Sequence, residues 1–155
     1  MRLRQASLLI LSLVAIGPCS AADPDGDAIK NELKKHQGTW VATSSIHDDQ
    51  PAPEAIVRSI KRIVTDDHVV WERDGKRFAG TKIELDPSRE PRTIDLIPDG
   101  GPKRGEHVPG IYKLEGDVLT ICTAGPGQPR PKKFQASKGS GCTLQTFQRE
   151  RSSAK

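Results

Sequence analysis

The sequence predicts an all-β fold, an antiparallel β-barrel of about eight strands with one or two short helices, preceded by a signal peptide. Three observations indicate this fold. The hydrophobic period changes from that of a helix to alternation after Gly38. Asp74-Gly75, between two strand-like runs, is the sequence of a tight hairpin turn. Short strand-like runs recur at intervals of roughly 8 to 12 residues, which is typical of a barrel or sandwich.

Residues 1–22 form the predicted signal peptide. Arg2 and Arg4 supply positive charge at its start, Leu8–Ile16 is an almost unbroken apolar run, and Ser20-Ala21-Ala22 suits a signal peptidase. The run is too short to cross a bilayer, which takes roughly 20 residues. We therefore expect an exported protein, periplasmic or extracellular, without a transmembrane span.

Cys19 offers a second processing route. A cysteine directly after the apolar run carries the lipid in lipoproteins, so the chain would then be anchored at Cys19. A small residue normally precedes such a cysteine, whereas here the residue is Pro18. Cleavage after Ala22 is the main expectation. The remaining parts are then a polar segment and helix start over 23–31, the barrel domain over 32–151 and a disordered tail over 152–155.

Charge argues against nucleic acid as a partner. The formal net charge is +4 and falls to +2 when Arg2 and Arg4 leave with the signal peptide. An excess of this size does not attract a polyanion. Hydrophobic residues make up 34% and aromatic residues 4% of the chain, so the core is modest. A domain of this length folds alone by burying about two-thirds of its unfolded surface.

A helix opens the mature chain. Asp27 suits its N-cap, Ile29, Leu33 and His36 share one face, and Gly38 stands where a helix C-terminal glycine belongs. The elements expected next are a strand over 39–46, a proline-punctuated break over 48–53, a short amphipathic helix over 54–61, and strands over 62–65 and 68–73.

Two turn sequences predict hairpins. Asp74-Gly75 accepts the positive φ that a type I′ turn requires at both central positions, and Glu115-Gly116-Asp117 marks a second turn. The first turn joins 68–73 to 77–85, and the second joins 110–114 to 118–123. Further strands are predicted over 93–97, 132–135 and 143–149, with loops between them.

Several segments resemble a family of uncharacterised lipocalin-like domains from planctomycete bacteria. The run Leu33–Trp40, LKKHQGTW, resembles the opening LKKLQGTW of that family, with His36 where the family has leucine. Thr93–Leu96, Gly110–Cys122, the loop Pro126–Pro131 and Phe147–Glu150 are also similar. The resemblance implies a lipocalin-like β-barrel in a small exported protein, and it carries no catalytic residue.

The start of the first strand also resembles the Gly-x-Trp of lipocalins. By that resemblance, Trp40 plugs the barrel end beneath Arg149, in a cation–π contact of about 0.5–2 kcal/mol. Trp71, Phe78 and Tyr112 are the other large residues expected to point inward. They would line a cavity if the barrel is hollow, or fill it if the barrel is packed, since an eight-stranded barrel allows either.

No catalytic or metal site is predicted. Cys122 and Cys142 are either a disulfide or two separate thiols, because spacing alone does not decide between them. His47-Asp48-Asp49 and Asp66-Asp67-His68 resemble metal ligands, but neighbours on a strand point to opposite faces. There is no Gly-x-Ser-x-Gly motif. We therefore expect no enzyme activity, metal or cofactor.

The leading functional hypothesis is a binding module. It holds a small apolar ligand in the barrel mouth beneath residues 54–61, an expectation by analogy of fold. The alternative is an envelope protein-interaction or structural domain that acts through its outer surface. The basic clusters on that surface are Arg58–Arg62, Lys103-Arg104 and Arg130–Lys133.

Overall fold

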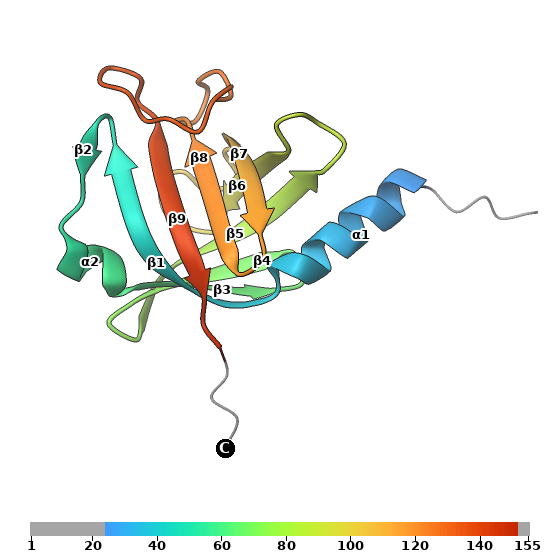
Figure 1. Ribbon diagram of the computed structural model, residues 1–155, viewed down its shortest axis with the longest axis horizontal. Helices are drawn as coiled ribbons and strands as arrows, with labels where there is room; N and C mark the ends of the chain where they lie inside the picture. Colours follow the sequence, from blue (N-terminus) through green and yellow to red (C-terminus); the bar gives the residue numbers. More distant parts are fainter. Residues whose placement is uncertain (1–23, 152–155) are drawn as a thin grey trace, which may run out of the picture.

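The computed structural model describes residues 24–151 and shows a closed barrel of eight antiparallel strands, with a two-residue strand beside it and two short helices (Figure 1). The predicted all-β barrel is confirmed. The signal peptide over 1–22, Cys19 and the tail over 152–155 lie outside the described residues. The elements are α1 (Pro24–His36), β1 (Gly38–His47), β2 (Gln50–Pro51), α2 (Glu54–Arg58), β3 (Ile60–Thr65), β4 (His68–Arg73), β5 (Lys76–Asp86), β6 (Thr93–Pro98), β7 (Val108–Glu115), β8 (Val118–Thr123) and β9 (Thr143–Arg149).

The barrel closes through β1. Strands β3 to β8 each pair with the next strand along the chain, and β1 pairs with both β3 and β9. Trp40 thereby faces Arg62 on one side and Arg149 on the other. A register shift between Ala42 and Ser44 bends β1 as it crosses to β9. Closure satisfies the backbone of what would otherwise be two exposed edges.

The turn at Asp74-Gly75 has the predicted conformation. Asp74 has φ 50° and Gly75 has φ 72°, as a type I′ turn requires. The strand predicted over 132–135 is wrong, because the described chain between β8 and β9 is a long loop without a strand. Pro129 and Pro131 have no N–H to donate to a ladder, which disfavours a strand there.

Both predicted helices exist, with different bounds. α1 begins at Pro24, before the expected cap at Asp27, because proline fits the first helical turn and the acids of that turn favour the helix dipole. α2 ends at Arg58, not at Lys61, because Ile60 pairs with Arg73 in the sheet. No helix within residues 24–151 is long and apolar enough to cross a bilayer.

Protein side chains fill the barrel interior. Trp71 packs against Phe147 at 6.0 Å between ring centres, and its indole Nε1 donates to the Thr81 hydroxyl at 2.9 Å. The apolar residues that surround them are buried, namely Trp40, Val64, Val69, Ile83, Leu85, Ile94, Tyr112, Leu119 and Ile121. The end of α1 lies against the barrel where β1 begins (Figure 1), which we name the closed end. There α1 buries Glu32 and His36.

Candidate functional site

The predicted plug is present at the closed end. Trp40 is fully buried, and the Arg149 guanidinium carbon lies 4.0 Å from the centre of its ring system. The Trp40 Nε1 donates to the His36 carbonyl at 2.8 Å. Arg149 donates to the Lys35 carbonyl at 2.6 Å and to the Asp117 carboxylate at 3.2 Å. These bonds tie the last turn of α1 to β9, where a cation also favours the helix dipole.

Two of the three predicted lining residues point inward, and both touch protein. Trp71 contacts Phe147, and Tyr112 lies edge-on to the His36 imidazole at 5.0 Å between ring centres. Burial is the main cause that raises the pKa of the Tyr112 hydroxyl, with the Glu32 charge adding to it. These two residues therefore belong to a packed interior.

The prediction for Phe78 is wrong. Its side chain is 55% exposed and lies beneath the Arg73 guanidinium, 5.6 Å from the ring centre. The cause is the alternation along β5: Thr81, Ile83 and Leu85 are buried and Ala79 lies opposite the inward Trp71, so the neighbouring Phe78 points outward. A bulge, in which Trp71 pairs with Ala79 and Glu72 pairs with Arg77, also leaves Phe78 without a partner on β4. The aromatic ring consequently faces solvent.

The two cysteines are free thiols. Cys122 is buried and Cys142 is half-buried. Cys122 pairs with Leu144 across the ladder, so Cys142 is two residues beyond the position directly opposite. Burial raises the pKa of the Cys122 thiol, and the nearby Cys142 adds to the effect. The structure thus shows the two-thiol alternative.

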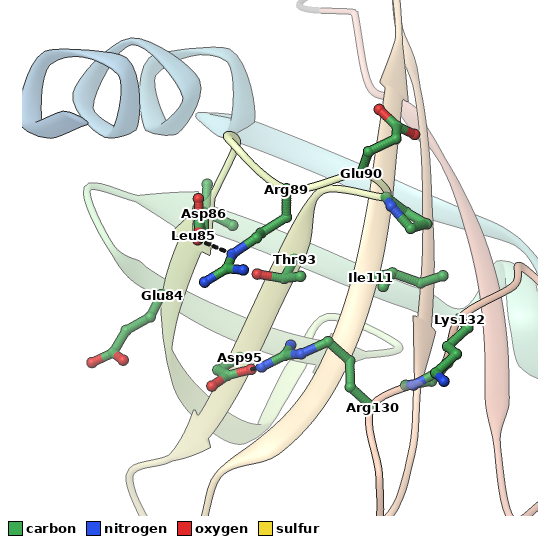
Figure 2. Close-up of a pocket in the computed structure, with 12 residues that line it drawn as sticks. Glu84, Leu85, Asp86, Arg89, Glu90, Thr93, Asp95, Ile111, Arg130 and Lys132 are labelled. Atoms are coloured by element: carbon green, nitrogen blue, oxygen red, sulfur yellow. Dashed lines mark hydrogen bonds and ion pairs between the residues drawn. The ribbon is translucent and has the colours of Figure 1, made fainter. Parts of the chain in front are cut away.

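A broad depression lies on the outer wall of the barrel. A groove of about 610 Å³ crosses the outer face of β5, β6 and β7. The β5–β6 turn bounds it on one side and the long β8–β9 loop on the other (Figure 2). Its lining residues are Glu84, Leu85, Asp86, Arg89, Glu90, Pro91, Thr93, Asp95, Ile111, Arg130, Pro131 and Lys132.

Arg130 attaches the long loop to this wall. Its guanidinium donates to the carbonyls of Ile94 at 3.1 Å and Gly110 at 2.7 Å. It also lies 2.6 Å from the Asp95 carboxylate. The neighbouring Pro131 and Ile111 both line the groove, and both are buried although Ile111 points away from the barrel interior. The groove therefore has an apolar floor beside a fixed guanidinium.

Arg89 approaches the floor from the opposite side. Figure 2 shows Arg89 and Arg130 on either side of Thr93. The Arg89 Nε donates to Asp86 at 3.0 Å, which leaves its terminal amino groups unbonded within residues 24–151. Hydrogen bonds from Ser88, followed by those from Arg89, lower the pKa of Asp86. Asp86 and Asp95 are thus already neutralised by the two arginines.

Lys132 is the cation of the groove without a counter-ion among the described residues. Glu84 lines the groove but is paired at 3.1 Å with Lys82, which does not line it. The Glu90 carboxylate points away from the floor in Figure 2. The remaining hydrogen-bond donors at the groove are therefore the Lys132 ammonium and the terminal amino groups of Arg89. These groups favour an anion.

Sequence reasoning did not place this site. In the sequence Arg130–Lys133 form a basic cluster, and no pattern assigns a role to Asp86, Glu90 or Asp95. The β5–β6 turn and the β8–β9 loop meet because the long loop folds across the outer wall, where Arg130 bonds to the carbonyls of Ile94 and Gly110. Within residues 24–151, no three His, Cys, Asp or Glu side chains are grouped as metal ligands.

The chain matches no protein-family model, no curated protein and no solved structure. The similarity to planctomycete lipocalin-like domains accordingly stays a prediction.

Proposed function

We propose that this chain is an exported, lipocalin-like binding domain that holds a small organic anion in the outer groove. The observation that carries the proposal is the pair of free hydrogen-bond donors, the terminal amino groups of Arg89 and the ammonium of Lys132, beside the apolar floor of Ile111 and Pro131. A volume of about 610 Å³ lies within the range of about 300–1,000 Å³ that small-molecule sites occupy. The ligand class is a carboxylate with a short apolar body.

The groove accommodates a ligand better than the barrel interior does. An apolar ligand in the interior would have to displace Trp71, Tyr112 and Phe147, which are already buried against protein. Displacing one well-packed aromatic side chain costs several kcal/mol. The groove requires no such displacement, and its arginines are held in place by Asp86 and Asp95.

Hexanoate is a suitable anionic probe. Neutral hexanol and cationic hexylamine have the same chain length and serve as its controls. We expect hexanoate to shift the backbone amide NMR signals of Thr93, Ile111 and Lys132, and the other two compounds to do so far less. The R89Q/K132Q double variant should bind hexanoate about 10-fold more weakly, since an exposed ion pair contributes about 0.2–1 kcal/mol.

K133Q is the matched control, because Lys133 is exposed and does not line the groove. It should bind hexanoate as the wild type does. Equal weakening by K133Q and by the double variant would indicate a general charge effect. Equal shifts from hexanol would mean that the cations have no part in binding, and either result would refute the proposal.

A second candidate function is an envelope protein-interaction surface centred on Phe78. The favouring observation is that Phe78 is one of two large hydrophobic side chains exposed within residues 24–151, and it borders a depression of about 460 Å³. Exposed aromatic rings commonly anchor interfaces. We expect F78A to lose an envelope protein that the wild type retains in pull-downs, while I56A, the control at the other exposed position, keeps it. Identical recovery by all three proteins would exclude this role.

A further inference from the structure

The interior of the barrel contains a buried cation without a counter-ion. Arg62 on β3 is fully buried, and none of its three guanidinium nitrogens has a hydrogen-bond partner within the described chain. The ladder places it between Trp40 and Trp71. Burial lowers the pKa of Arg62 to about 9, so the group is still charged at neutral pH. Leaving such a charge uncompensated costs several kcal/mol.

One neutral side chain near Arg62 is also unsatisfied. Both ring nitrogens of His36 are buried without hydrogen-bond partners in residues 24–151. The charge of Arg62 acts directly on His36, where it is the largest influence on the pKa after burial. The His36 ring touches the Tyr112 ring edge-on, with 5.0 Å between their centres, and the Tyr112 hydroxyl lies beside the Glu32 carboxylate. Two unsatisfied polar side chains, Arg62 and His36, therefore share the closed end.

Neighbouring carboxylates do not supply the negative counter-charge that Arg62 lacks. Glu32 is the acid buried at this end, and it already accepts from Lys35 at 3.0 Å and from Arg92 at 2.9 Å. Asp117 is occupied by Arg149 at 3.2 Å. Among these cations of the closed end, Arg62 is the one without a carboxylate partner in residues 24–151.

We propose that the closed end is an internal binding site for a halide-sized anion, held by the Arg62 guanidinium and one N–H of His36. Both side chains are fully buried, so the site admits no anion larger than a halide. The anion would satisfy donors on β3 and α1 at once and fasten α1 to the barrel. This inference does not depend on the groove, which lies on the outer wall.

Thermal unfolding in sodium chloride or bromide, compared with sodium gluconate at equal ionic strength, tests the site. Gluconate matches the screening but is too large to enter. We expect the halide to raise the midpoint of the wild-type protein by about 5 °C over gluconate when it is at ten times its Kd. R62M, which replaces the cation with an apolar side chain of similar length, should abolish this difference.

The matched control is R104M, at an exposed arginine without an ion pair among residues 24–151. It should keep the full halide effect. Should R62M not fold, H36L provides a second test, with the halide effect expected to fall several-fold. Crystals grown in bromide should give an anomalous peak beside Arg62. Equal midpoints in halide and gluconate, or bromide peaks confined to the surface, would overturn the proposal.

Discussion

Replacing Trp40 with alanine is expected to lower the free energy of unfolding by about 3–5 kcal/mol, as measured by urea denaturation. The side chain is fully buried. Its loss leaves a cavity, removes the 4.0 Å contact with Arg149, and deletes the donor to the His36 carbonyl. This loss is a large share of the total, since domains of this size are stable by only about 5–15 kcal/mol.

F78A is the matched control for W40A. It also removes an aromatic ring, but from a site that is 55% exposed, so its effect should stay within about 0.5 kcal/mol. Equal losses of unfolding free energy in W40A and F78A would contradict a stabilising role for the buried side chain of Trp40. W40F separates packing from hydrogen bonding, because it retains a ring and lacks the indole donor.

The second large effect is acid destabilisation through His36. Burial, followed by the charges of Arg62, Arg149, Arg92 and Lys35, lowers the pKa of His36 to about 3. The unfolded chain takes up this proton near pH 6.5, whereas the folded protein does not. The stabilising contribution of neutral His36 is therefore complete above pH 6.5 and is lost as the pH falls toward 3. The loss approaches about 5 kcal/mol, at about 1.4 kcal/mol for each pH unit.

Urea denaturation between pH 7 and pH 4 in a halide-free gluconate buffer measures this effect. H36L should have a much flatter profile, because leucine binds no proton. H47Q is the control, since His47 is exposed and should leave the slope unchanged. A wild-type profile as flat as that of H36L would contradict a buried neutral imidazole.

Much of the fold follows from local sequence. The type I′ turn at Asp74-Gly75, the strand runs around it and the first helix depend on backbone preferences and on side-chain periods that neighbouring residues determine. The contact between Trp40 and Arg149 could also be predicted, because these residues belong to the first and last strands, which meet when a sheet of this kind closes. Inward or outward direction is predictable wherever the alternation is regular.

The outward direction of Phe78 follows from the alternation along β5, in which Thr81, Ile83 and Leu85 are buried. The tertiary structure decided only that a bulge leaves Phe78 without a partner on β4. It also decided the path of residues 132–135, where a strand was expected. Arg130 instead directs that segment onto the outer wall through two backbone carbonyls and Asp95.

The sequence by itself determined that this chain forms an antiparallel barrel, because turns and alternation act over a few residues, and the resemblance to lipocalins placed the closed end near Trp40. Only the tertiary structure decided where unsatisfied charge collects. Arg62 appears in the sequence as one member of a basic cluster, and its isolation becomes visible only when three strands and α1 enclose it. Desolvation and pairing depend on neighbours that are distant along the chain, so local patterns do not reveal them.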